Sequence, residues 1–265
     1  MKIPPVDKMN KRGIKMNICI FDTETTSLEK PFCYNVGYVI MDTETQETLV
    51  EKEFVIEQIW HNLPLFNSAY YADKRPIYVQ AMRSRKIKLD KWGYVCRQMS
   101  RDFQQFAVHS AYAFNSGFDE KVFAFNCDWF KCINPFDTVP IFDIRGYVHK
   151  FLVNDIYKKV CDKYGYYTEN GHYSTTAETV FRVIFDKHDF IEEHTALSDA
   201  IIEAAILFEC WEAGAEFGTD YKAKRSIERP QEKTLHIRTV EQTDYYFEYN
   251  KIRINKEKTE ITLKE

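Results

Sequence analysis

The stretch MNICIFDTETTSL, residues 16–28, holds a short apolar run that ends in two acids. Residues 16–22 predict a buried strand, because the run is apolar and stops at Asp22. Successive side chains of a strand point to opposite faces, so Asp22 and Glu24 point the same way. Their like charges repel, and a hard cation such as Mg²⁺, which prefers carboxylate oxygen, would relieve that repulsion. A solvated turn at a strand end is the alternative interpretation of this pair alone.

The segments around this strand predict an α/β fold with a mixed sheet. Residues 32–42 and 47–57 are two further strands, and their short connection indicates an antiparallel meander. A helix over 92–106 and a strand over 107–114 follow. The remaining expected helices cover residues 118–130, 144–152, 155–164, 177–185 and 196–211. The helix at 177 is preceded by a Thr-Thr-Ala-Glu capping box at 175–178, in which the Thr hydroxyl and the Glu carboxylate satisfy free backbone donors.

Composition narrows the class of protein. The chain has 265 residues, of which 45% are hydrophobic and 29% charged, so it is globular rather than disordered. The longest uncharged stretch, residues 103–118, is shorter than the roughly 20 apolar residues that span a membrane, so we expect no membrane partner. The seven cysteines include no C-x-x-C pair, which favours reduced thiols in a cytoplasm over a disulfide framework or a structural zinc site.

The ends of the chain differ from its centre. Residues 1–15 are polar and basic and predict a loose N-terminal leader without the apolar region of a secretory signal. After Gly214 the segments 234–240, 245–254 and 259–264 alternate polar and apolar residues. We therefore expect a central domain over 16–214 and a small strand-rich C-terminal appendage over 215–265, whose role the sequence does not indicate.

Two later motifs carry further acids. Asp119 lies in NSGFD (115–119), directly after a predicted strand and at the start of a helix. Asp199 lies in the first turn of the helix over 196–211, and His194 precedes it by five residues. Taken singly, each acid is explained by the helix dipole and the histidine by a structural role. The joint occurrence, in this order and on these elements, favours a common site.

These motifs resemble the DEDDh (DnaQ-like) branch of the DEDD 3′–5′ exonuclease superfamily, typified by the proofreading subunit of bacterial DNA polymerase III. The matching stretches are FDTETTSL (21–28), NSGFDEKVF (115–123) and HTALSDAIIEAAIL (194–207), and TTAETVFRVI (175–184) is similar to phage-encoded stand-alone members. The family usually has Gly where this chain has Ser27, a mild departure. The resemblance covers residues 16–212 and implies a ribonuclease H-like mixed sheet flanked by helices.

The resemblance also implies roles for residues. Asp22, Glu24, Asp119 and Asp199 would bind two Mg²⁺ ions, for which Mn²⁺ can substitute, and His194 would be the general base. Around the first motif, Thr23 and Thr25 would contact the terminal nucleotide. Asn115 is a further candidate for lining the site, and local hydrogen bonding is the alternative role for Thr25 and Asn115.

A basic segment points to nucleic acid. Residues 73–101 hold nine Lys or Arg residues against two acids, in a chain whose formal net charge is −4, and aromatic residues are interleaved with them. Cationic side chains contact phosphates and aromatic rings stack on unpaired bases, so we expect this segment to touch substrate. A solvated helix face with tyrosines packed in the core is the alternative.

The sequence thus predicts a metal-dependent 3′–5′ exonuclease that acts on single-stranded 3′ ends, with DNA favoured over RNA. An exoribonuclease of the same family is the first alternative. A non-catalytic, polymerase-associated nucleic-acid-binding protein is the second, and an unrelated α/β protein with surface acids is the third. A role in proofreading, DNA repair or replication would require a partner polymerase, and the appendage could bind that partner or form a homodimer.

Overall fold

The computed structural model describes residues 16–230, 233–236, 252–255 and 260–263. Its main element is a six-stranded sheet with the order β4-β3-β2-β1-β5-β6. The strands are β1 (Asn17–Thr25), β2 (Cys33–Asp42), β3 (Thr48–Ile56), β4 (Lys88–Asp90), β5 (Val108–Ala113) and β6 (Ile141–Asp143). The first three strands form the expected antiparallel meander. Each of the other three is parallel to its neighbour: β4 to β3, β5 to β1 and β6 to β5. The prediction of a mixed sheet is therefore confirmed.

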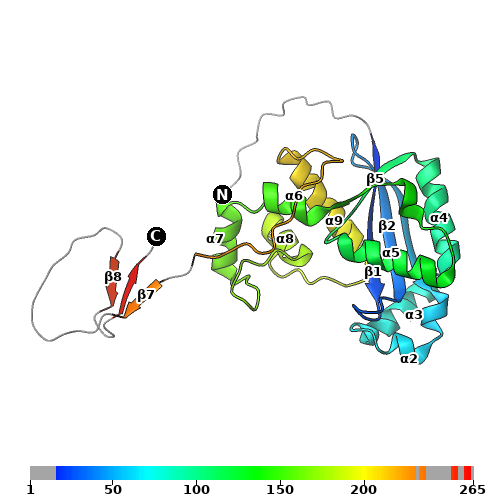
Figure 1. Cartoon of the computed structure of the whole chain (residues 1–265), viewed down its shortest axis with the longest axis horizontal. Helices are drawn as coiled ribbons and strands as arrows, with labels where there is room; N and C mark the ends of the chain where they lie inside the picture. Colours follow the sequence, from blue (N-terminus) through cyan, green and yellow to red (C-terminus); the bar gives the residue numbers. More distant parts are fainter. Residues whose placement is uncertain (1–15, 231–232, 237–251, 256–259, 264–265) are drawn as a thin grey trace, which may run out of the picture.

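Helices cover both faces of this sheet (Figure 1). They are α1 (Glu57–Trp60), α2 (Leu63–Phe66), α3 (Arg75–Arg83), α4 (Trp92–Gln105), α5 (Gly117–Phe130), α6 (Ile144–Phe151), α7 (Asp155–Tyr164), α8 (Ala177–Ile184) and α9 (Ala196–Glu212). Two short 3₁₀ turns lie at Ala72–Lys74 and Pro135–Thr138. The helices α4 and α5 pack on one face, and α6, α8 and α9 on the other.

The alternation of β1 separates two cores. Cys19 and Phe21 are buried in the core beneath α4 and α5, whereas Ile18 and Ile20 are buried in the core beneath α9. Strand β1 is therefore covered on both faces, which explains why its sequence is a continuous apolar run.

The predicted elements match the structure closely, with three differences. Strand β1 continues to Thr25, because its last residues stay paired with β2, so Glu24 is a strand residue opposite Asn35. Helices α1, α2 and α3, between residues 57 and 83, were not predicted, because they are short: α1 and α2 have four residues each and α3 has nine. Strands β4 and β6 were not predicted either, because three residues are too few to display alternation.

Two β2 residues position the start of α9. A methyl group on Gly37 would lie 2.1 Å from Leu197 N, so only glycine allows the helix backbone to approach the strand this closely. Next to it, the buried Asn35 accepts a hydrogen bond from Ala196 N at 2.8 Å through its side-chain Oδ1. The same amide donates to Phe54 O at 3.0 Å, which ties α9 to β3 as well.

Residues 215–230, assigned from the sequence to the appendage, pack against the main body. Ala215 and Ile227 are buried, and the Phe217 ring stacks on Trp211 at a centroid distance of 5.8 Å. The strands β7 (Lys233–His236), β8 (Ile252–Asn255) and β9 (Glu260–Leu263) form a separate sheet with the order β7-β9-β8. The leader at 1–15 and residues 237–251 lie outside the described residues. The proposed division of the chain at 214 stays a prediction.

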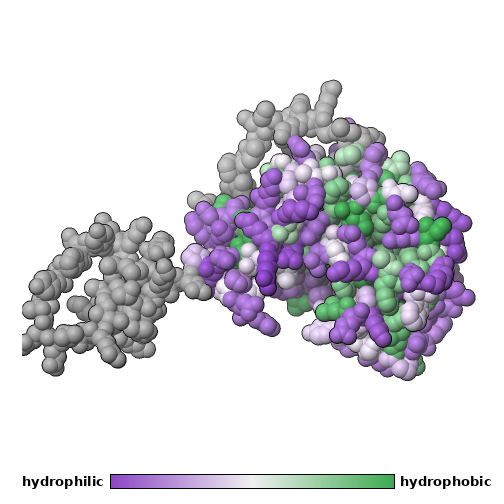
Figure 2. Space-filling view, viewed as in Figure 1, coloured by the Kyte–Doolittle hydropathy of each residue, from purple (hydrophilic) through white to green (hydrophobic). Residues whose placement is uncertain are grey.

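In the described part of the chain, no helix has both the length and the apolar character needed to cross a membrane. On the face of the molecule drawn in Figure 2, hydrophobic residues form short patches separated by hydrophilic side chains. The uncharged stretch 103–118 is divided between the end of α4, β5 and the start of α5.

Candidate active site

The end of β1 sends acids toward α9 and a hydroxyl toward α5. Asp22 and Glu24 follow Ile20 in the alternation, and Ile20 faces the core beneath α9. Thr23 points to the opposite face, where its Oγ1 donates a hydrogen bond to Asp119 Oδ1 at 2.6 Å. This contact joins the first sequence motif to the second across 96 positions of the chain.

Asp119 is held by the junction of β5 and α5. Strands β1 and β5 are parallel neighbours, with Ile20 opposite Tyr112, so both strands end at the same edge of the sheet. Asp119 lies in the first turn of α5, where the helix dipole favours a carboxylate, and its exposed fraction is only 3%.

The third motif completes the cluster. Asp199 lies in the first turn of α9, and Ser198 Oγ donates to its Oδ1 at 3.1 Å. Ligand atoms of Glu24, His194 and Asp199 all lie within 4.8 Å of one another. His194 has a φ of 52°, a left-handed conformation that is uncommon for a residue with a side chain. Such strain is frequent at functional sites.

Two residues of the site were not predicted from the sequence. Glu203 lies four residues after Asp199 on α9, and is 3% exposed. Its Oε2 accepts a hydrogen bond from Phe114 N at 3.1 Å, at the end of β5. The i,i+4 spacing from Asp199 was the available signal, since residues four apart share a helix face. Glu192, the second such residue, has Oε2 3.6 Å from His194 Nδ1.

The 3₁₀ turn at Ala72–Lys74, together with Tyr71 just before it, joins the start of the basic segment to the site. Tyr71 stacks on the His194 imidazole at a centroid distance of 4.5 Å and an interplanar angle of 15°. Lys74 Nζ donates a hydrogen bond to the backbone oxygen of Glu193, immediately before that histidine. Arg75 is occupied elsewhere, because its guanidinium lies over the Trp60 ring at 3.9 Å. Most of the other basic residues of 73–101 are exposed on α3, α4 and the segment between them.

Two other residues predicted to contact the nucleotide, Thr25 and Asn115, make hydrogen bonds outside the cluster of acids. Thr25 is half-buried at the end of β1, and its hydroxyl donates to Ser27 O at 3.4 Å. Asn115 is exposed, with a φ of 63°, and its backbone N–H donates to Asp143 Oδ1 at 2.9 Å. The Thr25 contact is local, whereas Asn115 is joined through its backbone to a residue 28 positions away, and contact of either side chain with a nucleotide stays a prediction.

The carboxylates raise one another's pKa. Burial and the charge of Asp199 raise the pKa of Glu24 to about 8. Burial raises the pKa of Asp119 and that of Asp199 to about 7. Burial and the charges of Asp119 and Glu203 raise the pKa of Asp22. Among the described residues, no Lys or Arg makes an ion pair with any of these acids.

Comparisons with known proteins rest on the fold. No protein-family model matches the chain, and no curated protein sequence matches it. A 3′-exonuclease solved in a study of 3′-end-specific recognition of a histone mRNA stem-loop is similar, with a TM-score of 0.51 and 16% identity; the match covers 76% of this chain and 84% of that one. The chain has the fold of this 3′-exonuclease.

Two further solved structures are similar to this chain, with lower TM-scores. The nuclease domain of 3′hExo, a DEDDh family member bound to rAMP, has a TM-score of 0.47 and 15% identity over 80% of this chain and 98% of that one. E. coli exonuclease I in complex with a dA16 oligonucleotide has a TM-score of 0.45 and 13% identity over 72% of this chain and 40% of that one.

On this exonuclease fold, the acids form a set that fits divalent cations. Five carboxylates (Asp22, Glu24, Asp119, Asp199 and Glu203) lie around one edge of the sheet. Carboxylate oxygens are the ligands that Mg²⁺ and Mn²⁺ prefer. Their raised pKa values mean that ionising them together costs free energy unless a cation compensates the charge. The donor set therefore matches the expected Mg²⁺ site in charge and in ligand type.

Proposed function

We propose that this protein is a metal-dependent 3′–5′ exonuclease that hydrolyses phosphodiester bonds at single-stranded 3′ ends, with DNA as the preferred substrate. One observation carries the proposal. Asp22, Glu24, Asp119, Asp199 and His194 come from three distant motifs and lie around one edge of a sheet that has a 3′-exonuclease fold. A decayed, non-catalytic relative would be expected to have lost one of them.

The proposed roles follow from position and protonation state. Divalent ions held by Asp22, Glu24, Asp119 and Asp199 would stabilise the charge that develops on the attacked phosphate. Thr23 orients the Asp119 carboxylate through its hydrogen bond.

His194 accepts the proton of the attacking water. Desolvation and the charge of Lys74 lower its pKa, which keeps the imidazole neutral and able to accept a proton at pH 7. Glu192 Oε2 lies 3.6 Å from Nδ1, which leaves Nε2 as the ring nitrogen not facing this carboxyl group.

Exposed aromatic residues next to His194 suit an unpaired 3′ end. Tyr70 is 89% exposed, and its ring meets Tyr71 edge-to-face at 4.8 Å. Aromatic rings bind unpaired bases without sequence preference. An exoribonuclease is the alternative, because the similar 3′-exonuclease was studied with a histone mRNA stem-loop.

The experiment is a time course with 5′-labelled single-stranded DNA and RNA oligonucleotides in Mg²⁺ or Mn²⁺, resolved on a denaturing gel. EDTA and the double variant Asp22→Asn/Asp199→Asn serve as negative controls. Asp128→Asn is the matched control, because Asp128 is an exposed carboxylate that pairs with Lys131 on α5.

We expect a ladder that shortens stepwise from the 3′ end, faster on DNA than on RNA, and unchanged in Asp128→Asn. A faster reaction on RNA would support the alternative function, an exoribonuclease. Absence of metal-dependent shortening of either strand would refute the catalytic proposal and favour a polymerase-associated binding protein.

A further inference from the structure

Three cysteines from different segments meet on the face of the sheet away from α9. Cys96 lies in α4, Cys127 in the last turn of α5, and Cys132 just beyond that helix. The Cys96 and Cys127 sulfurs are 3.7 Å apart, and those of Cys132 and Cys96 are 3.9 Å apart. All three sulfurs lie within 4.8 Å of one another, and each cysteine is a free thiol.

The end of α5 brings Cys132 back to the cluster. Lys131 takes a left-handed conformation with a φ of 52°, which stops the helix. The chain then reverses, and Cys132 N donates to Cys127 O at 3.0 Å. This turn holds the thiols of Cys127 and Cys132, which are five positions apart, next to Cys96. Cys96 lies 31 residues before Cys127.

The spacing of the sulfurs matches that of thiolates around a tetrahedral metal ion. Zinc–sulfur bonds are about 2.3 Å long, so two sulfurs of a tetrahedral site are about 3.8 Å apart. Both separations involving Cys96 fall within about 0.1 Å of this value. A disulfide would need about 2.0 Å and would use only two of the three thiols.

One sulfur of the cluster accepts a hydrogen bond from a neighbouring ring. The Trp92 indole N–H donates to Cys127 Sγ at 3.4 Å. All three thiols would lose their protons to solvent as a metal binds, as thiol ligands ordinarily do.

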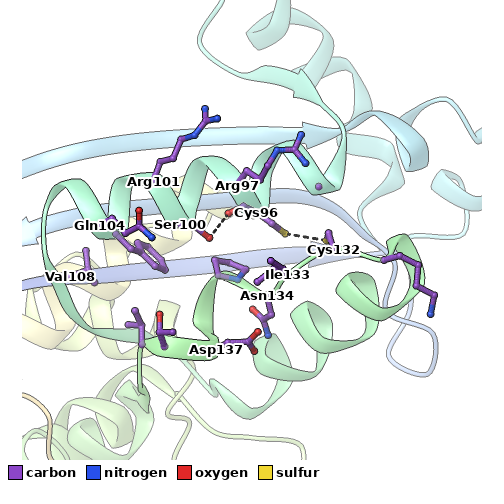
Figure 3. A pocket seen from close by; sticks show the side chains of 16 residues that line it. Cys96, Arg97, Ser100, Arg101, Gln104, Val108, Cys132, Ile133, Asn134 and Asp137 are labelled. Atoms are coloured by element: carbon purple, nitrogen blue, oxygen red, sulfur yellow. Dashed lines mark hydrogen bonds between the residues drawn. The ribbon is translucent and has the colours of Figure 1, made fainter.

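A cavity of about 750 Å³ opens beside the cluster, and both Cys96 and Cys132 line it (Figure 3). Asp137 lines the same cavity from the 3₁₀ turn after α5. Arg97 and Arg101 line this cavity as well, from α4. Water from this cavity could therefore supply a fourth ligand to a metal held by the three sulfurs.

We propose that Cys96, Cys127 and Cys132 form a second metal site, specific for a soft divalent cation such as Zn²⁺ and separate from the carboxylate cluster. The ion would cross-link α4, α5 and the chain beyond α5. The ligands come from three segments with no C-x-x-C spacing, which explains why the sequence disfavoured a zinc site.

The test uses Co²⁺ as a probe on the reduced full-length protein after removal of metals. Thiolate ligands give Co²⁺ a charge-transfer absorption that carboxylates do not, so the signal separates the two sites. We expect the band to saturate at one equivalent and to disappear when Zn²⁺ is added. It should persist in Asp22→Asn/Asp199→Asn, which alters only the carboxylate cluster.

The variant that tests the ligand set is Cys132→Ala, because Cys132 is the least buried of the three. We expect it to weaken Co²⁺ binding at least ~100-fold and to remove the charge-transfer band. Cys161→Ala, in α7 on the opposite face of the sheet, is the matched control and should keep the band.

A second measurement needs no variant. Saturating Zn²⁺ should protect Cys132 of the wild-type protein from alkylation, mapped by mass spectrometry, and raise Tm by about 5 °C or more. A Co²⁺ complex without charge-transfer absorption, or alkylation of Cys132 at the same rate with and without Zn²⁺, would overturn the proposal.

Discussion

At the scale of single residues, buried charge is the dominant feature of the candidate active site. Glu203 illustrates it, because it is as buried as Asp119 and its charge contributes to the raised pKa of Asp22. Phe114 N already occupies one of its oxygens. Burial and the charge of Asp119 raise the pKa of Glu203 itself, so a bound cation would favour its charged form behind the other acids.

We predict that Glu203→Gln weakens the apparent affinity for Mg²⁺ by roughly 10–100-fold, the usual effect of losing an outer partner of a metal site. The amide oxygen keeps the hydrogen bond from Phe114 N, so folding is retained. The measurement is the Mg²⁺ dependence of the exonuclease rate and of Tm. A wild-type Mg²⁺ dependence would show that Glu203 has only a structural role.

Tyr71 governs the environment of the imidazole, because the two rings stack. We predict that Tyr71→Ala lowers kcat by about 10-fold with little change in KM, since a mobile base is less well oriented. Tyr71→Phe keeps the ring and should behave as wild type.

The pH profile supplies an independent readout. Desolvation lowers the pKa of His194, so the exposed imidazole in Tyr71→Ala should titrate at higher pH. In the pH profile of kcat/KM, the midpoint of the acidic limb should then move toward about 6.5, the ordinary pKa of histidine. An unshifted limb would mean that Tyr71 does not shield His194.

At the scale of secondary-structure elements, the position of α9 decides where Asp199 lies. Gly37 sets the distance between α9 and β2, and a methyl group there would meet the helix backbone, which cannot rotate away. Gly37→Ala should lower the free energy of unfolding by about 1–3 kcal/mol and kcat by roughly 10-fold or more.

Gly93→Ala is the control for that substitution. Its added methyl group would lie 3.6 Å from its nearest neighbours, an ordinary contact within α4. Stability should be unchanged or rise by up to about 1 kcal/mol, since alanine favours a helix. Urea denaturation and steady-state rates check both variants. An equal response of the two would show that the close approach of α9 at Gly37 does not set its position.

The last residue of α3 and the segment after it carry exposed basic side chains. We predict that replacing Arg83, Arg85 and Lys86 by alanine weakens binding of single-stranded DNA evenly across sequences. The slope of log K against log salt should decrease by about 0.7 for each phosphate that these side chains neutralise in the wild-type protein.

The matched control removes three exposed lysines from the other side of the sheet: Lys159, Lys163 and Lys187. Its slope should equal that of the wild type. Equal slopes for all three proteins would show that the segment is a solvated surface and does not bind substrate.

At the scale of the whole molecule, the buried acids couple folding to pH and to metal. Asp119, Asp199 and Glu24 have folded-state pKa values raised from 3.8, 3.8 and 4.5 to about 7, 7 and 8. A carboxyl group with a raised folded-state pKa favours the folded state below its unfolded pKa and disfavours it once ionised. Metal-free stability should therefore decrease as pH rises from about 4 to about 8.

Thermal unfolding in EDTA and in Mg²⁺ across this range is the measurement. We expect Tm in EDTA to fall with pH and Mg²⁺ to restore it most at the alkaline end, where the carboxylates are ionised. Asp22→Asn/Asp199→Asn should flatten the EDTA curve. Parallel curves with and without Mg²⁺ would contradict the assignment of a cation site.

Local patterns in the sequence determined much of this protein. The apolar run that ends in Asp22, the antiparallel meander and the helix at 196 were predicted, because buried strands and helices carry their own periodicity. The order of the three motifs also favoured a common site for Asp22, Glu24, Asp119 and Asp199. Helices α1, α2 and α3 were missed, because short elements carry little local signal.

Only the tertiary structure decided the remaining features. The buried Glu203, the Tyr71 ring on His194 and the close approach of α9 to Gly37 depend on segments far apart in the chain. The three-cysteine cluster likewise depends on tertiary packing, because only the contact of α4 with α5 brings Cys96 to Cys127 and Cys132. Sequence periodicity reports which face of an element is buried, but which side chains meet there is set by how the elements pack.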